Sequence, residues 1–117
     1  MNYRVTFYRT TQGDKPLALW LLGLRQNQPI LSDLVTAGLQ KLRDSDRHHK
    51  PLVELVDLIN RIFEMRVGRA NIARVFFFYD GDEIICTNGY VKQRNQLDQS
   101  ELDRARRYQR DWMERKR

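Results

Sequence analysis

The stretch NIARVFFFYDGDEIICT, residues 71–87, constrains the fold more than any other part of this sequence. From residue 72 to residue 79, both faces of the alternating pattern are apolar apart from Arg74. One face holds Ala73, Val75, Phe77 and Tyr79, and the other holds Ile72, Phe76 and Phe78. A strand that is covered on both faces lies in the middle of its sheet. Asp80-Gly81-Asp82 then predicts a tight hairpin, because glycine readily adopts the positive φ that such turns need.

The neighbouring segments extend this strand into an antiparallel meander. IFEMRV, residues 62–67, precedes it across a short reversal at residues 68–71, and EIICTNGYVK, residues 83–92, follows the hairpin. At the start of the chain, YRVTFYRT places Tyr3, Val5 and Phe7 on one face, which predicts a half-buried strand. The segment LVELVDLIN, residues 52–60, fits a helical turn or a strand equally well and is assigned only as a connector.

Two helical patterns separate the first strand from the meander. The first follows Asp14, which is expected to cap it, and tolerates Pro16 in its first turn. Its expected buried face consists of Leu17, Trp20, Leu21 and Leu24. The second starts at Pro29, and its expected buried face consists of Ile30, Leu31, Leu34, Val35, Gly38 and Leu42. We expect the two helices to form a hairpin on one side of the sheet.

A last helix is predicted from LDQSELDRARRYQRDWMERKR, residues 97–117. Asp98 and Glu101 have the spacing of a capping box. The apolar stripe consists of Leu102, Ala105, Tyr108 or Gln109, and Trp112. Asp103 with Arg107, and Asp111 with Arg115, have the four-residue spacing of solvated ion pairs. The pattern as a whole predicts one α+β domain over residues 1–117: an N-terminal strand, a two-helix hairpin, a three-strand antiparallel meander and a C-terminal helix.

The chain is basic, with 21 Lys and Arg against 15 Asp and Glu, a net charge of +6. Sixteen of the 21 cations are arginine, whose guanidinium binds phosphate through two hydrogen bonds. This balance favours RNA, DNA or an acidic protein as a partner, although a basic surface can also serve solubility alone. The single cysteine, Cys86, excludes an internal disulfide. The sequence shows no signal-peptide layout and no membrane-length apolar run, so a cytoplasmic location is expected.

Arg74 interrupts an apolar strand face, where a lone guanidinium would be costly to bury. Glu64 on the preceding strand is the expected cross-strand partner, which leaves positive charge on Arg66 and Arg69. Lys92 and Arg94 follow the next strand, with Asn88 and Tyr90 on the same face as Lys92. One sheet surface is thus expected to combine cations with a phenol, a pattern suited to phosphate contacts and base stacking. Its candidate residues are Arg66, Arg69, Arg74, Asn88, Tyr90, Lys92 and Arg94.

Other chemical signatures are missing from the sequence. We find no glycine-rich phosphate loop, no Cys-His zinc set and no acidic cluster spaced for magnesium. His48 and His49 fall in a polar segment and are interpreted as solvated rather than as ligands or bases. The sequence therefore predicts that any catalysis needs neither metal nor cofactor.

Three motifs in the meander resemble the HigB-like, phage-derived killer-protein branch of the RelE/ParE toxin superfamily. They are Glu64-Met65-Arg66, the Arg74-Val75-Phe76 strand that ends in Asp80-Gly81, and Gly89-Tyr90-Val91-Lys92. The resemblance covers nearly the whole chain and implies a RelE/ParE-like fold. It also implies a toxin of a toxin-antitoxin pair that cleaves mRNA in the ribosomal decoding site. Its partner would be an antitoxin, often one with a helix-turn-helix domain.

The resemblance also implies roles for individual residues. Arg66 and Arg74 would hold the scissile phosphate, Lys92 and Arg94 would add charge, and Tyr90 would stack or assist. Branch members often carry a His where this chain has Asn88. A lysine desolvated among arginines can act as a base, so Lys92 is the hypothetical proton acceptor.

Two other functions fit the same sequence. A ParE-like poison of DNA gyrase would use the same fold without the nuclease residues. A catalytically inactive module would keep the basic sheet only as a seat for an acidic antitoxin. Cleavage of RNA that is lost when the arginines are substituted would distinguish the endoribonuclease from the gyrase poison and from the inactive module.

Overall fold

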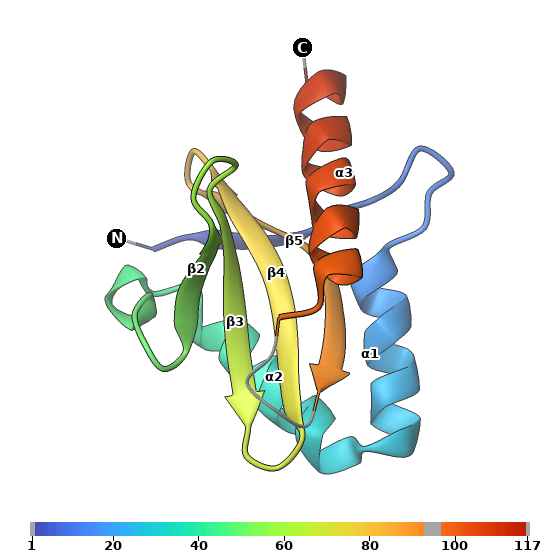
Figure 1. Ribbon diagram of the computed structural model, residues 1–117, viewed down its shortest axis with the longest axis vertical. Coiled ribbons are helices and arrows are strands. Elements are labelled where there is room, and N and C mark those ends of the chain that lie inside the picture. Colours follow the sequence, from blue (N-terminus) through green and yellow to red (C-terminus); the bar gives the residue numbers. More distant parts are fainter. Residues whose placement is uncertain (1, 93–96, 117) are drawn as a thin grey trace.

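The computed structural model describes residues 2–92 and 97–116, in which five strands form one sheet with helices on both of its faces (Figure 1). The chain order is β1 (Arg4–Phe7), α1 (Pro16–Asn27), α2 (Pro29–Lys41), the 3-10 turn η1 (Ser45–Arg47), β2 (Val53–Asp57), β3 (Ile62–Gly68), β4 (Ile72–Asp80), β5 (Glu83–Lys92) and α3 (Gln99–Arg115). The strands lie in the order β1-β5-β4-β3-β2. The predicted α+β class and the three-strand antiparallel meander are confirmed.

β4 is the central strand, as its two apolar faces predicted. Residues 73–78 are all buried, and β4 pairs antiparallel with β3 on one side and with β5 on the other. The hairpin between β4 and β5 turns at Gly81, whose φ is +61°. β1 joins the far side of β5 in parallel, with Val5 opposite Ile84 and Phe7 opposite Cys86. β1 therefore pairs only with the first half of β5, residues 83–86.

The segment assigned as a connector contains a strand. β2 pairs antiparallel with β3, placing Val53 opposite Met65 and Glu54 opposite Glu64. The helical spacing of its apolar residues was misleading, because Leu55 and Ile59 are 38% and 91% exposed and form no buried face. β2 is an edge strand, so neither of its faces needs a continuous apolar pattern.

The helices divide the sheet into two unlike faces. α1 and α2 cover the larger core, which includes Leu17, Val35, Met65, Val75 and Phe77. Gly89 in β5 allows α1 to approach closely, because a Cβ at that position would lie 2.5 Å from the Trp20 ring. α3 covers the other face and packs its own Leu102 and Ala105 against the sheet. Its sheet neighbours there include Ile62, Phe76 and Tyr90.

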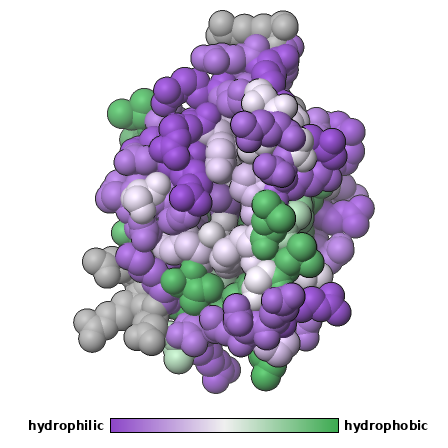
Figure 2. Space-filling view, turned by 90° about the vertical axis from the view of Figure 1, so that its right-hand side faces the viewer, coloured by the Kyte–Doolittle hydropathy of each residue, from purple (hydrophilic) through white to green (hydrophobic). Residues whose placement is uncertain are grey.

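The cap of α1 and the exposure of two α2 residues differ from the sequence prediction. Asp14 does not cap α1: the N-cap position is Lys15, and Asp14 instead takes part in a turn with Thr10. Ile30 and Leu34 are 79% and 43% exposed, because α2 turns them away from the sheet, whereas Leu31 and Val35 are buried. Leu19 and Leu22 of α1 are also exposed, and Figure 2 shows hydrophobic residues gathered low on this side of the molecule.

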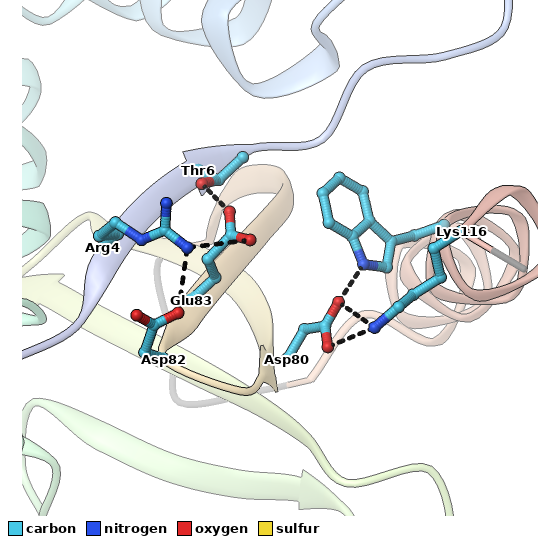
Figure 3. Close-up of polar contacts among 7 residues, drawn as sticks. Arg4, Thr6, Asp80, Asp82, Glu83 and Lys116 are labelled. Atoms are coloured by element: carbon cyan, nitrogen blue, oxygen red, sulfur yellow. Dashed lines mark hydrogen bonds and ion pairs between the residues drawn. The ribbon is translucent and has the colours of Figure 1, made fainter.

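The C-terminal end of α3 is fastened to the end of β4. Asp80 accepts hydrogen bonds from the Trp112 indole at 2.7 Å and from the Lys116 ammonium at 2.6 Å (Figure 3). These two bonds lower the pKa of Asp80 below its usual value. The predicted ion pair between Asp111 and Arg115 is present. Asp103 pairs with Arg106 rather than with Arg107, because Arg106 also reaches Asp57 of β2 and so links α3 to the sheet.

Candidate nucleic-acid interface

Three of the predicted site residues form one row across the sheet, next to the N-terminal end of α3. Arg66 of β3 stands directly opposite Arg74 of β4, which in turn stands opposite Tyr90 of β5. The Arg74 guanidinium lies 5.8 Å from the centre of the Tyr90 ring. We call Arg66, Arg74 and Tyr90 the arginine row. Like charges directly opposite each other on neighbouring strands repel, so the row needs a compensating anion.

Glu64 supplies that anion from the neighbouring position of the same β3 face. Its Oε1 accepts from Arg66 Nε at 2.5 Å and from Arg74 Nη1 at 3.1 Å, and its Oε2 accepts from the Tyr90 hydroxyl at 3.2 Å. Both Glu64 and Arg74 are fully buried. The predicted pairing of Arg74 with Glu64 is therefore confirmed. One carboxylate holds all three members of the row in place.

Arg66 has a second carboxylate partner that the sequence prediction did not include. Its Nη1 lies 2.5 Å from Glu54 Oε2, and the Arg66 side chain keeps 21% of its surface exposed. Glu54 was missed because residues 52–60 were assigned as a connector. In the structure residues 53–57 form a strand beside β3, and its register places Glu54 opposite Glu64 and close to Arg66.

Tyr90 also links the arginine row to the start of α3. Its hydroxyl accepts from the backbone N–H of Asp98 at 3.2 Å, while Asp98 caps α3 by accepting from the backbone N–H of Glu101. The predicted capping box is thus half formed, with the Tyr90 hydroxyl in the place of the Glu101 side chain. Burial raises the pKa of Tyr90, and the Glu64 carboxylate adds to that shift, so the phenol stays protonated at neutral pH.

Lys92 lies beyond the row rather than inside it. Its Nζ is 3.3 Å from Asp98 Oδ2, and 35% of its side chain is exposed. Hydrogen bonds from Ser100 and from the Glu101 backbone, together with Lys92, lower the pKa of Asp98 to about 2. The hypothetical base was expected to be desolvated among arginines, but Lys92 is instead partly hydrated and paired with a carboxylate.

Two further predicted residues, Arg69 and Asn88, lie apart from the row. Arg69 is exposed in the turn between β3 and β4, and it makes no ion pair with any residue that the structure describes. Asn88 is buried and donates from its amide to the Glu101 carbonyl at 3.0 Å, so it fastens α3 to β5 instead of facing solvent. Arg94 lies outside the described residues.

His48 is not solvated, contrary to expectation, but it is not placed for catalysis either. It stacks on Tyr3, with ring centres 5.2 Å apart, on the sheet face opposite the arginine row. Its Nε2 donates to the Leu42 carbonyl at 2.6 Å, which leaves Nδ1 to accept from the Tyr79 hydroxyl at 2.7 Å. Both ring nitrogens are thus engaged in holding η1 against the sheet.

The described part of the chain contains neither a metal-binding cluster nor a membrane-spanning helix. Within residues 2–92 and 97–116, no three His, Cys, Asp or Glu side chains gather closely enough to hold a metal ion. No helix in this part of the chain combines the length and the apolar character that crossing a bilayer requires. Cys86 is fully buried in β5, and burial raises the pKa of its thiol to about 12, so it is an inert core residue.

Comparison with known families identifies the group to which this arrangement belongs. The model of the phage-derived Gp49-like proteins (DUF891) matches residues 23–110, most of the chain. The chain belongs to this family. The Gp49-like proteins are a RelE/ParE-type toxin family of toxin-antitoxin systems, associated with RNase-like toxins. No curated protein matches the chain. The Gp49-like match includes β2 to β5 and most of α3, and therefore the whole arginine row.

Proposed function

We propose that this Gp49-like protein is the toxin of a toxin-antitoxin pair and cleaves mRNA on the ribosome without a metal ion. The observation that supports this most is the arginine row: two guanidinium groups at directly opposite positions, with a phenol beside them and a single buried carboxylate between them. In a RelE/ParE-type toxin family, this row supports binding of a phosphate, because Arg66 reaches the surface and its guanidinium can exchange the Glu54 carboxylate for a phosphate.

The proposed reaction is attack of a ribose 2′-hydroxyl on the neighbouring phosphate. The 2′-hydroxyl gives up its proton to water, and the new bond joins the 2′-oxygen to phosphorus. The bond from phosphorus to the 5′-oxygen breaks, and the leaving 5′-oxygen takes up a proton from water. The products are a 2′,3′-cyclic phosphate and a 5′-hydroxyl end. Negative charge increases on the phosphate oxygens in the transition state, and a guanidinium group held beside them stabilises that charge.

The two arginines differ in what they can contact. Arg66 reaches the surface with 21% of its side chain, whereas Arg74 is fully buried in this structure. We therefore assign the direct contact with the phosphate to Arg66. Arg74 acts as a positioning residue, because it holds Glu64, and Glu64 in turn fixes the Arg66 guanidinium. Tyr90 completes this support and presents a protonated phenol at the edge of the row.

The remaining elements of the proposal concern partners. Membership of a toxin family implies that the protein has an antitoxin partner, and we propose that this antitoxin contains a helix-turn-helix domain. The ribosome and its mRNA in the cytoplasm are the proposed target. The meander motifs resemble those of HigB-like toxins, and we propose that the protein is related to that branch of the superfamily.

Induced expression in cells tests the function. Wild type, Arg66→Ala, Arg74→Lys and Arg107→Ala would be compared for growth and for new RNA ends on ribosome-bound messages. Arg107 is an exposed arginine of α3 and makes no ion pair with a described residue, so its variant controls for loss of one positive charge. Thermal melting of each purified protein shows which variants remain folded.

The expected result is growth arrest with in-frame cleavage for wild type and Arg107→Ala, and loss of both for Arg66→Ala. Arrest with intact messages would contradict the nuclease and favour poisoning of DNA gyrase. An absence of arrest in every case, with antitoxin binding retained, would favour the inactive binding module.

A further inference from the structure

A second basic surface adjoins the arginine row where β2 begins. β2 pairs with β3 as far as Met65, and the Arg66 backbone N–H still donates to the Leu52 carbonyl at 2.8 Å, so the open edge of the sheet begins at Val67 and Gly68. A hollow of about 710 Å³ lies at this edge. It is lined by residues of α2, of the segment before β2, and of β2, β3 and β4. Arg66 belongs to both the hollow and the arginine row.

The charged residues of this hollow are mostly positive. The hollow is lined by three cations, Lys41, Lys50 and Arg66, and by one carboxylate, Glu54. Lys41 has no ion pair with any residue in the described ranges, and 77% of the Lys50 side chain is exposed. The walls between the charges are apolar, from Leu34, Leu52, Val67 and Ile72. Cations separated by apolar side chains suit a chain of phosphates and sugars better than a single small ion.

Glu54 occupies the place that an incoming anion would take. One of its oxygens lies 2.5 Å from Arg66 Nη1, and the other lies 3.5 Å from Lys50 Nζ. The carboxylate therefore bridges the two cations that border the hollow on this side. A phosphate group has the same charge-assisted hydrogen bonding to offer, and Arg66 can receive it only if Glu54 moves aside.

We propose that this hollow binds the RNA backbone next to the scissile phosphate, with Lys41 and Lys50 contacting phosphates and Glu54 competing with them for Arg66. The choice of RNA as ligand rests on the proposed function. Lys41 and Lys50 set affinity in this scheme and take no part in bond breaking. Glu54 keeps the site neutralised until RNA displaces it.

Binding of a short single-stranded 2′-O-methyl RNA tests the inference, because this probe lacks the attacking hydroxyl and cannot be cleaved. Its dissociation constant would be measured over a range of salt concentrations for wild type, Lys41→Ala, Lys50→Ala and Glu54→Gln. Lys15→Ala and Glu114→Gln are the matched controls, because they make the same charge changes at exposed positions outside the hollow.

We expect Lys41→Ala and Lys50→Ala each to weaken binding several-fold and to reduce the slope of log K against log salt by about 0.7 per lost phosphate contact. Glu54→Gln should tighten binding several-fold, more than Glu114→Gln does. Equal effects of the hollow variants and their controls would overturn the inference, as would an absence of measurable binding by wild type at low salt. Unchanged RNA affinity with weakened binding of poly-glutamate would assign the hollow to an acidic protein instead.

The same variants keep this inference separate from the proposed function. If wild type cleaves mRNA in cells but the lysine variants bind the probe normally, the hollow is not an RNA site and the nuclease stands. If affinity follows the lysines but no cleavage occurs, the RNA site stands and the nuclease does not.

Discussion

Two charged regions lie on the sheet face that α3 covers, one at each end of the helix, and they are built on opposite principles. At the C-terminal end, Asp80 of β4 accepts a hydrogen bond from Trp112 of α3 and forms an ion pair with Lys116, the C-cap residue of α3 (Figure 3). Both contacts join β4 to the helix. We call this set the latch. At the N-terminal end, the arginine row sets two cations against each other on neighbouring strands and holds them on one buried carboxylate. The latch joins single opposite charges across two elements, whereas the row keeps two cations side by side and depends on the carboxylates of Glu64 and Glu54 to balance them.

The largest expected effect is on the row. Glu64→Gln leaves the buried Arg74 guanidinium without a carboxylate partner, while Arg66 keeps Glu54, so we expect a loss of about 3–5 kcal/mol in the free energy of unfolding. Urea denaturation followed by circular dichroism measures it. A loss of less than about 1 kcal/mol would show that the row does not depend on its carboxylate.

Substitution of Arg66 should affect activity more than stability. Arg66→Ala removes a surface-reaching guanidinium, so we expect cleavage of ribosome-bound mRNA to fall by about 10²–10³-fold, the usual cost of one transition-state donor. Single-turnover rates on programmed ribosomes measure the effect. A rate within the scatter of the Arg107→Ala control would remove Arg66 from the site.

A smaller effect is expected where the row meets α3. Asp98→Ala removes the cap of α3 and should cost about 1 kcal/mol in stability. Because the folded-state pKa of Asp98 is lowered to about 2 from 3.8, its contribution is present above pH 3.8 and is lost as the pH falls through about 2. Asp98→Asn keeps the capping oxygen but not the charge, so it should flatten this part of the stability profile. An unchanged profile in Asp98→Asn would contradict the assignment.

The latch should respond more weakly still. Asp80→Asn loses an ion pair with a lysine whose side chain is 47% exposed, so we expect less than about 1 kcal/mol, diminishing in high salt. The same denaturation experiment, run in low and high salt, measures it. A cost equal to that of Glu64→Gln would erase the distinction between the two regions.

The smallest expected effect concerns Lys92. Since this residue is paired with Asp98 and partly exposed, Lys92→Arg should keep both the rate of cleavage and its pH dependence. The pH-rate profile of the variant is the measurement. A shift or loss of one limb of that profile would restore Lys92 as the proton acceptor.

The sequence predicted the parts of the fold that depend on strong local patterns. The doubly apolar β4, the hairpin at Gly81 and the stripe of α3 each follow from periodicity or from one turn residue. The pairing of Arg74 with Glu64 was predictable for a related reason: a buried guanidinium requires a partner, and the adjacent strand offered one.

What the sequence did not predict depends on contacts between distant segments. β2 is a short edge strand whose identity comes from pairing with β3, and without it Glu54 could not be placed beside Arg66. Asn88 alternates correctly for the site, but α3 lies over it and takes its amide. The contacts of Lys92 with Asp98, and of His48 with Tyr79 and Leu42, were not predicted for the same reason, because these partners come together only in the folded chain.

The central claim is that the arginine row promotes attack by a ribose hydroxyl on the adjoining phosphate. The most direct test is an analysis of RNA ends after incubation of the purified protein with ribosomes carrying a defined message. A second message would carry one 2′-deoxynucleotide at the cleavage position. The account predicts 2′,3′-cyclic phosphate and 5′-hydroxyl ends with wild type, none with Arg66→Ala, and no cut at the deoxy position. Cleavage of the deoxy message, or ends carrying a 5′-phosphate, would contradict it.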